Sequence, residues 1–244
     1  MDYKGQQLVQ LLHKAQDLFL PHISIDTVIF GYEQRQLKVL VLQLTDNKWM
    51  LPGGYIGIQE SLDEAACRIL KERIGLEDVC LKQFYTFGSP ERSFAKELPA
   101  LFKELGAALP EDHWIMQRFI STGYYALVHI PDSMPTPGLF AKGFKWATVS
   151  ELPRLLFDHE HIVQVAVKNL QEIIKVNPIA FHLLPTKFTM PELHRLFESI
   201  LERKMDRSRF QKKMFSYQVF ERLQERREGG AHRRPYLYSY RKEV

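Results

Sequence analysis

The segment GGYIGIQESLDEAACRILKERIGL, residues 53 to 76, combines glycines, carboxylates and arginines at spacings that could handle phosphate groups. Its two glycines predict a turn, and Ser61 followed by Glu64 forms a capping box, which predicts a helix from Ser61 to about Arg73. Carboxylates on such a helix are the hard oxygen ligands that Mg²⁺ requires when it neutralises a diphosphate. The segment therefore has the frame of a phosphate-handling catalytic helix, although several of the expected carboxylates are missing.

This spacing resembles the Nudix box, whose pattern is G-x5-E-x7-R-E-U-x-E-E-x-G-U, with U a bulky aliphatic residue. The preceding WMLPGGY matches the turn that commonly leads into a Nudix box. Ile69 stands where the first glutamate of the R-E-U-x-E-E segment is expected, and Arg73 stands where its last glutamate is expected. The residues that match the pattern are Gly54, Glu60, Arg68, Leu70, Glu72, Gly75 and Leu76.

The resemblance implies the Nudix fold, and the two replacements predict that the metal site is lost. Nudix hydrolases cleave diphosphates joined to another moiety, using divalent cations held by these glutamates. A cation at Arg73 would repel a metal ion about 4 Å away by several kcal/mol at surface-like dielectric. We therefore expect no metal, no cofactor and no hydrolysis. Glu64, Arg68 and Glu72, four residues apart, predict a charge ladder. An apolar stripe toward the sheet is expected from Leu62, Ala65, Ile69 and Leu70.

A Nudix hydrolase of nucleoside diphosphate derivatives such as ADP-ribose remains the alternative, because Nudix enzymes vary in where the base and metal ligands come from. The loop acids Glu91, Glu111 and Asp112 are candidates for that role, although loop acids are usually only solvated. His159 and His161 in FDHEHI also invite a metal interpretation. A spacing of two on a helix splays their side chains apart, so we expect cap or interface residues instead.

The composition predicts a protein of one or two domains without a membrane span. At 244 residues and 45% hydrophobic content the chain can bury a core, and it contains no run of 18 apolar residues. The first twenty residues are typical of an amphipathic helix rather than of a secretory signal. Cys67 and Cys80 have neither disulfide nor metal-ligand spacing, so we expect packing residues in a reduced, cytoplasmic protein.

The pattern of strands and helices predicts an α+β fold. With the resemblance, it implies a Nudix α/β/α sandwich with a mixed sheet, followed by a C-terminal winged helix-turn-helix domain. We expect an N-terminal helix over 1–20, a Nudix-like effector-binding domain over 21–175 and the winged helix over 176–244. Strands are expected over 23–32, 36–44, 80–87, 119–130 and 143–149, one short and one long helix over 150–176, and a partly helical insertion around 93–113.

The C-terminal segment differs from the rest of the chain in charge. From Val176 onward there are 15 Lys and Arg against 8 Asp and Glu, whereas the first 175 residues hold 18 against 21. Such asymmetry is typical of a domain that binds a polyanion. Thr189 with Glu192 forms a second capping box, and Asp206 can cap a second helix. YQVFERL and PYLYSY then flank a basic tip, so helix, turn, helix and hairpin predict a winged helix-turn-helix.

Residues 153–215 resemble the Nudix-related transcriptional regulators of bacteria, most closely in LLPTKFTMPELHRLFESIL followed by D-R-S-R-F. In that family a non-hydrolysing Nudix domain senses a ligand and a winged helix binds the operator. Known members respond to ADP-ribose-type nucleotides or to a sugar such as arabinose. The resemblance implies that this chain is a regulator with a sugar or nucleotide-sugar effector, double-stranded operator DNA as partner and no membrane association.

Candidate contact residues follow from these assignments. Phe210 and Met214 are four apart and are expected to face the core of the winged helix. The expected DNA-binding residues are Arg207, Arg209, Lys212 and Lys213 on the recognition helix, and Arg226, Arg227, Arg233 and Arg234 at the wing tip. The insertion is expected to alter the rim of the effector pocket. Its candidate ligand-binding residues are Arg92, Trp114, Arg118, Tyr124 and Tyr125.

Two questions stay open at the level of sequence. A regulator of this kind is expected to bind paired half-sites as a homodimer, and the apolar face of the N-terminal helix could mediate pairing or pack on its own domain. That face consists of Leu8, Leu11, Leu12 and Ala15. A third function, a ligand-binding adaptor whose basic domain meets acidic proteins, is also compatible with the charge pattern.

Overall fold

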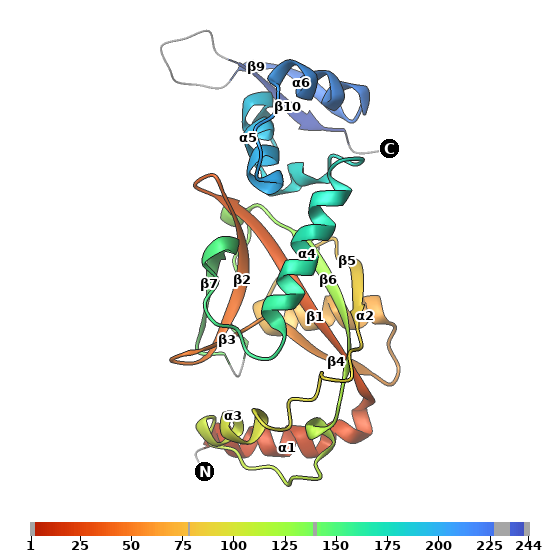
Figure 1. Ribbon diagram of the computed structural model, residues 1–244, viewed down its shortest axis with the longest axis vertical. Helices are drawn as coiled ribbons and strands as arrows, with labels where there is room; N and C mark the ends of the chain where they lie inside the picture. Colours follow the sequence, from red (N-terminus) through yellow and green to blue (C-terminus); the bar gives the residue numbers. More distant parts are fainter. Residues whose placement is uncertain (1–2, 78, 139–140, 227–234, 242–244) are drawn as a thin grey trace.

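The computed structural model describes residues 3–77, 79–138, 141–226 and 235–241. It confirms the α+β class: a mixed seven-stranded sheet is flanked by helices, and a second unit of helices and a three-stranded sheet lies at one end of the molecule (Figure 1). No helix in the described part of the chain is long and apolar enough to cross a membrane.

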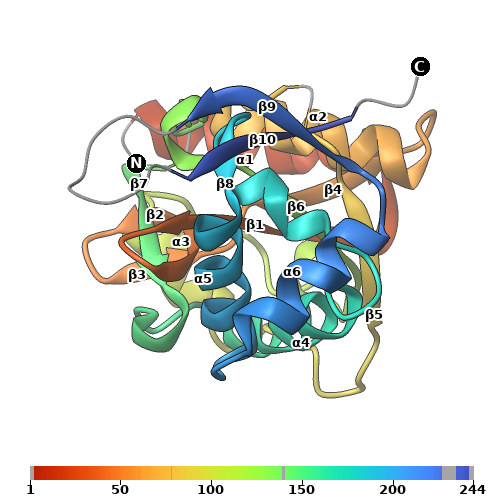
Figure 2. The same ribbon diagram turned by 90° about the horizontal axis from the view of Figure 1, so that it is seen from above.

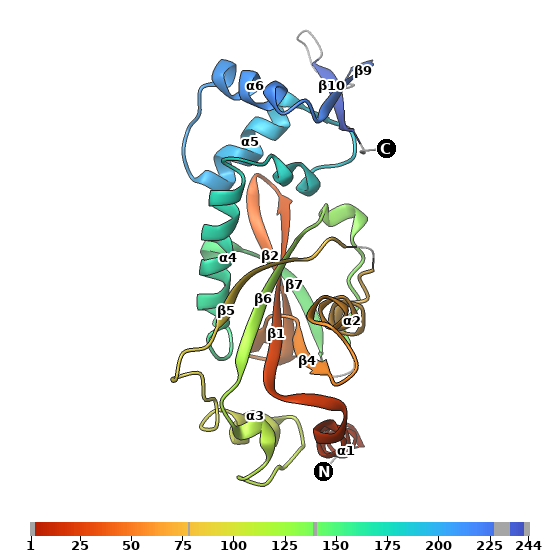
Figure 3. The ribbon, with the colours of Figure 1, turned by 90° about the vertical axis from the view of Figure 1, so that its right-hand side faces the viewer.

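The centre of the large sheet is β1, which pairs in parallel with β6 and antiparallel with β2 and β4. Residues 25–30 of β1 are buried in succession because helices cover both faces of the sheet. Figure 3 shows α4 (His159–Ile173) on one face and α2 (Leu62–Ile74) on the other. The strands are β1 (Phe19–Glu33), β2 (Gln36–Thr45), β3 (Lys48–Met50), β4 (Gly53–Gly57), β5 (Lys82–Phe87), β6 (Ile120–Leu127) and β7 (Gly143–Thr148).

Local sequence signals fix the ends of α2. The predicted capping box is confirmed: the Ser61 hydroxyl accepts from the Glu64 amide, and the Glu64 carboxylate accepts from the Ser61 amide. The helix ends at Gly75, whose φ of 67° lies in the left-handed region that favours glycine. The expectation that the cysteines pack in the core is wrong. Cys67 and Cys80 are both exposed.

The second unit has the order of a winged helix-turn-helix. It contains α5 (Met190–Leu201), α6 (Arg207–Ser216) and a sheet of β8 (Phe188–Thr189), β10 (Tyr236–Tyr240) and β9 (Phe220–Arg226). Figure 2, seen from this end, shows the two helices on one side of the unit and the β9–β10 ribbon on the other.

The predicted caps of this unit are confirmed. Thr189 and Glu192 make a capping box on α5, and the Asp206 carboxylate accepts from the Arg209 amide at the start of α6. Phe210 and Met214 are buried as expected, so one face of α6 is committed to the core and its other residues lie outward.

The N-terminal helix α1 (Tyr3–Leu18) packs on its own chain, at the opposite end of the molecule from the winged helix (Figure 1). It meets α3 (Leu98–Glu104), which is the helical part of the insertion, and the 3-10 turn Trp114–Met116. Leu8, Leu12 and Ala15 are buried in this cluster, while the side chain of Leu11 lies outside the described residues. The insertion and the N-terminal helix therefore form one apolar layer.

Helix α4 joins the two ends of the molecule. Its first residue lies near the β3–β4 turn, and its later turns pack against α5, where the Gln171 amide donates to the Ile200 carbonyl at 2.9 Å. The predicted short helix before it is only a 3-10 turn, Val149–Glu151. Further 3-10 turns lie at Ile130–Asp132 and Ile179–Leu183. One continuous apolar cluster runs from the large sheet through α4 into α5 and α6.

Candidate ligand-binding site

Arg68 makes four hydrogen bonds within the modified Nudix box. Its guanidinium contacts both oxygens of Glu60, at 2.9 and 2.5 Å, and donates to Glu72 at 3.1 Å and to the Tyr55 carbonyl at 2.8 Å. The hydrogen bond from Arg68 lowers the pKa of the Glu60 carboxyl. The charge ladder expected from Glu64, Arg68 and Glu72 is only partly present. Arg68 pairs with Glu72, but Glu64 belongs to the capping box, and Glu60 is the second partner of Arg68.

The two replaced positions have different structural uses. Ile69 is fully buried under the glycine turn, and a Cβ on Gly54 would lie 2.9 Å from its Cγ1. An apolar side chain therefore fills the space where the box has its first glutamate. Glu72 keeps a half-exposed side chain. Among the described residues no group of three His, Cys, Asp or Glu is placed to hold a metal ion.

Arg73 is a partly buried cation with few partners. Its Nε donates to the Gly53 carbonyl at 3.0 Å, and no carboxylate of the described residues lies within ion-pair distance of its guanidinium. Burial lowers the pKa of this guanidinium, although it remains charged at neutral pH. Because this cation is partly desolvated and has no carboxylate partner among the described residues, the position is suited to an anion.

A cavity of about 570 Å³ lies between α2 and the α1–α3 layer. This volume is in the range that holds a small ligand. Its wall is mostly aliphatic and aromatic; the side chains with polar groups among the described lining residues are Tyr55, Arg68, Glu72 and Arg73. The apolar lining comes from α1 through Leu8, Leu12 and Ala15, from the insertion through Leu98, Leu101, Phe102 and Leu105, and from α2 through Ile69. The sheet, turns and loops add Phe19, Leu42, Leu44, Met50, Ile115, Ala141 and Phe157.

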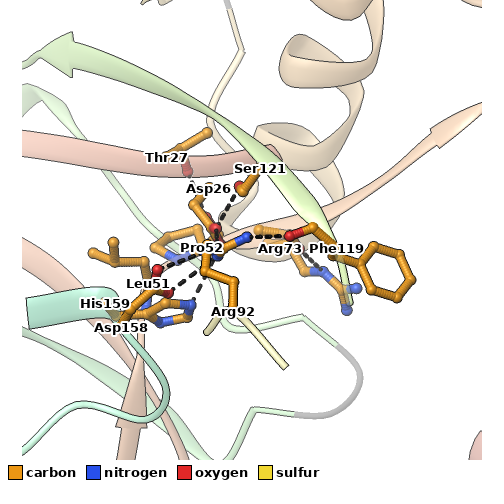
Figure 4. A network of polar contacts seen from close by, with 11 residues as sticks. Asp26, Thr27, Leu51, Pro52, Arg73, Arg92, Phe119, Ser121, Asp158 and His159 are labelled. Atoms are coloured by element: carbon orange, nitrogen blue, oxygen red, sulfur yellow. Dashed lines mark hydrogen bonds and ion pairs between the residues drawn. The ribbon is translucent and has the colours of Figure 1, made fainter. Parts of the chain in front are cut away.

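A second cavity of about 160 Å³ shares Tyr55 and Arg73 with the first and extends toward the start of α4. Its polar wall is a buried network, drawn in Figure 4, in which Arg92 lies between two carboxylates. Arg92 contacts Asp158 at 2.5 and 3.0 Å and Asp26 at 3.5 Å, and it donates to the Phe119 carbonyl at 3.0 Å.

Asp26 and His159 complete this network. The Ser121 hydroxyl donates to Asp26 at 2.6 Å, and His159 Nε2 lies 3.4 Å from the other Asp26 oxygen. His159 Nδ1 accepts from the Leu51 amide at 3.0 Å, which assigns the ring proton to Nε2. Burial acts to raise the pKa of the Asp26 carboxyl, but His159, Ser121 and Arg92 together hold this pKa below its ordinary value.

The network ties the glycine turn to α4. His159 thus has the interface role expected from the sequence, and His161 packs on the Phe87 ring with a centroid distance of 5.9 Å. The loop acids Glu91, Glu111 and Asp112 are exposed and line neither cavity.

The five residues expected to bind the ligand do not gather in one place. Arg92 lines the smaller cavity with its charge paired, and the indole of Trp114 donates to the Leu12 carbonyl within the α1–α3 layer. Arg118 is exposed and donates to the Gly88 carbonyl. Tyr124 lies under α2, donating to Asp63, and Tyr125 points to the α4 face, because neighbouring strand residues face opposite ways.

The cations expected to contact DNA are exposed on α6. Arg207, Arg209 and Lys212 face solvent, while Lys213 donates to the carbonyl of Lys175 and so leans toward the end of α4. Arg227, Arg233 and Arg234 lie outside the described residues, as does the side chain of Arg226.

The sequence alone did not indicate every residue of the winged-helix surface or of the ligand cavity. Between α6 and the β-ribbon lies a groove whose polar lining includes Gln211, Arg222 and Arg241. At the ligand cavity it missed Tyr55 and the apolar residues of the insertion. The one available signal was the apolar periodicity of the insertion, which predicted a helix without indicating what that helix covers.

An α/β/α sandwich carrying a modified Nudix box, joined to a winged helix, defines the class of this protein. Residues 20–166 match the model of the NUDIX domain, and residues 180–240 match the NrtR DNA-binding winged helix domain. The chain therefore belongs to the NrtR-like family, in which these two domains are combined, and the resemblance drawn from the sequence is confirmed.

Individual relatives span most of the chain. It is 23% identical over 229 residues to the ADPR responsive transcriptional repressor NtrR of Acinetobacter baylyi. The matched region covers 91% of this chain and 83% of the relative. It is 25% identical over 148 residues to an ADP-ribose pyrophosphatase of Methanocaldococcus jannaschii, covering 59% and 72%. The crystal structure of Shewanella oneidensis NrtR complexed with a 27mer DNA has a similar fold, with a TM-score of 0.71, 22% identity and coverage of 90% and 93%.

Proposed function

We propose that this protein is a ligand-responsive transcription regulator, in which the NUDIX domain binds an effector without hydrolysing it and the winged helix binds operator DNA. The observation that carries this proposal is the state of the box: an apolar residue and an arginine occupy two metal-ligand positions of a domain fused to a winged helix. Both replacements remove metal ligands, and a cavity large enough for a small ligand lies beside them.

The first effector to test is ADP-ribose. The Acinetobacter baylyi relative is named for its response to ADPR, and Arg73 offers a diphosphate the charge that a metal ion supplies in a hydrolase. A free sugar such as arabinose has no group for this cation. The relatives and the site thus favour a nucleotide over an arabinose-like sugar.

DNA binding is assigned to α6 and the wing. Arg207, Arg209 and Lys212 are exposed and unpaired by any carboxylate of the described residues, so they are available for phosphates and base edges. We propose that the wing-tip arginines add backbone contacts and that a homodimer places two winged helices on paired half-sites. A monomer in sedimentation that binds a single half-site would remove the dimer from this proposal.

The route from ligand to DNA runs along α4. A ligand in the smaller cavity meets Arg92 and His159, which hold the first turn of α4, and the later turns of α4 pack on α5. A ligand that binds one arrangement of this network better than another shifts the position of the winged helix.

The second candidate function is hydrolysis of ADP-ribose-type diphosphates. Glu60 and Glu72 are retained, and one relative is an ADP-ribose pyrophosphatase. Turnover that requires Mg²⁺ and is abolished by Glu72→Gln would favour this function over sensing.

The test is a gel shift on the DNA upstream of the protein's own gene, titrated with ADP-ribose, NAD, L-arabinose and xylose in the presence of Mg²⁺, with product analysis of each sample. We expect specific binding that ADP-ribose alters while remaining intact. Lys212→Ala should weaken binding and lower the slope of log K against log salt by about 1, because one phosphate contact is lost. The matched control, Lys82→Ala on β5, should leave both unchanged. No specific shift would refute the proposal, and acidic protein partners would then be sought instead.

A further inference from the structure

The insertion and the N-terminal helix give the ligand cavity a wall that the modified box cannot supply. Leu12 and Ala15 of α1 face the cavity together with Leu101 and Phe102 of α3, and all four are buried. These two helices lie at the end of the molecule away from the winged helix (Figures 1 and 3). The cavity is called the chamber below. Its apolar side, formed by α1 and α3, is the roof, and the opposite side, formed by the modified Nudix box, is the floor.

Charge is confined to the floor of this chamber. Arg68 and Glu72 neutralise each other there, and Arg68 is further paired with Glu60. Arg73 alone among the charged lining residues has no ion-pair partner in the described part of the chain. An anionic ligand group best completes this floor, because a neutral group leaves the partly buried cation of Arg73 unpaired.

The roof excludes a ligand that is polar throughout. A sugar hydroxyl buried against Leu101 or Phe102 would lose its hydrogen bonds to water and find no partner on the described wall. A hydrocarbon or a flat apolar ring gains free energy in proportion to the area that it buries in the same place.

We propose that the chamber binds an amphiphilic anion, a phosphate or diphosphate ester whose anionic group rests on Arg73 and whose apolar group fills the space under α1 and α3. This inference deepens the proposed function, on which it rests, by naming the chemical class of the effector. The guanidinium takes over the charge of the lost metal, so binding is independent of Mg²⁺.

A series of alkyl monophosphates tests the two halves of the chamber separately. Ethyl, butyl, hexyl and octyl phosphate, each below its micelle concentration, are titrated into the full chain by calorimetry, with and without Mg²⁺. We expect affinity to rise by roughly fourfold for each added methylene until the chamber is full, since each buried CH₂ contributes a similar free energy. Mg²⁺ should leave the values unchanged.

Two kinds of variant separate the anionic from the apolar contribution. Arg73→Gln should abolish the preference for hexyl phosphate over hexanol and keep the dependence on chain length, while Arg118→Gln, an exposed arginine outside the chamber, should keep both. Leu101→Trp should fill the chamber and flatten the chain-length series. Ala15→Leu, a smaller change in the same roof, should shorten the longest chain accepted if Leu101→Trp fails to fold.

The outcomes distinguish this inference from the proposed function. Equal affinity for all chain lengths in the wild type overturns the amphiphilic ligand, even if ADP-ribose binds through Arg73 and alters the gel shift. Chain-length-dependent binding that Arg73→Gln does not weaken overturns the role of Arg73. Arg73-dependent, chain-length-dependent binding by a protein that fails to bind DNA supports the chamber and refutes regulation.

Discussion

Arg92 and Arg73 line the same small cavity, but their surroundings differ (Figure 4). Arg92 is buried between Asp26 and Asp158 and uses its remaining nitrogen on the Phe119 carbonyl. Arg73 is partly buried, and its one hydrogen bond is to the Gly53 carbonyl. The first cation is neutralised by the protein itself, and the second is not.

The difference separates an arginine whose charge the fold neutralises from one whose charge is left available. Breaking a buried ion pair leaves an uncompensated charge, so a paired arginine contributes to stability chiefly through what its loss exposes. An unpaired arginine contributes little to stability, and its charge is available to a ligand. From the sequence, Arg92 was expected to bind the ligand and Arg73 to repel a metal ion. In the structure Arg92 is paired with two carboxylates, whereas Arg73 has no carboxylate partner among the described residues.

The largest effect that this comparison predicts is that of Arg92→Met. The change leaves Asp26 and Asp158 without their cation, so we expect the free energy of unfolding to fall by about 3–5 kcal/mol in urea titrations. Arg118→Met is the matched control. It removes one exposed hydrogen bond, and its cost should stay within about 1 kcal/mol. Equal losses from the two variants would contradict a structural role for Arg92.

A smaller effect is expected from acid. The folded-state pKa of Asp26 is below the ordinary value of 3.8, so its carboxylate stabilises the fold above that pH, and this contribution is lost as pH falls through the folded-state pKa. In urea titrations between pH 5 and 3, wild type should therefore lose more stability than Asp26→Asn, which starts from a lower value. Asp112→Asn, an exposed loop substitution, should follow the wild-type slope. Parallel curves for wild type and Asp26→Asn would contradict the network.

Much of the fold could be predicted because its signals are local. The capping boxes at Ser61 and Thr189, the glycine at the end of α2 and the strand patterns each depend on a few adjacent residues. Phe210 and Met214 were placed correctly because helical periodicity determines which face is buried. The resemblance to the box then implied a mixed sheet between helices, which no single segment determines.

The site was harder to predict because it depends on contacts between distant segments. Asp26 and Arg92 are 66 residues apart, and the indole of Trp114 reaches a carbonyl 102 residues away. Nothing near Arg92 in the sequence indicates that two carboxylates will surround it. Likewise, the aromatic residues Tyr124 and Tyr125 suited a ligand by type, but the alternation of a strand directs them to opposite faces of the sheet.

The smallest expected effect is that of Arg73→Met. One hydrogen bond to a carbonyl is lost, and the removal of a partly buried, unpaired cation offsets that loss, so the free energy of unfolding should change by about 1 kcal/mol or less. Arg68→Met on the same helix calibrates the measurement. It breaks the contacts with Glu60 and Glu72 at a partly exposed site and should cost about 1–3 kcal/mol in the same urea titrations.

The order Arg92, Arg68, Arg73 in loss of stability thus follows the number of carboxylates that each guanidinium contacts closely and how deeply the pair is buried. The loss of affinity for hexyl phosphate should follow a different order. Of the three variants, Arg73→Met should lose the most affinity relative to its loss of stability. A large loss of stability in Arg73→Met would mean that its charge already serves the fold, and the floor of the chamber would then have no cation left for a ligand.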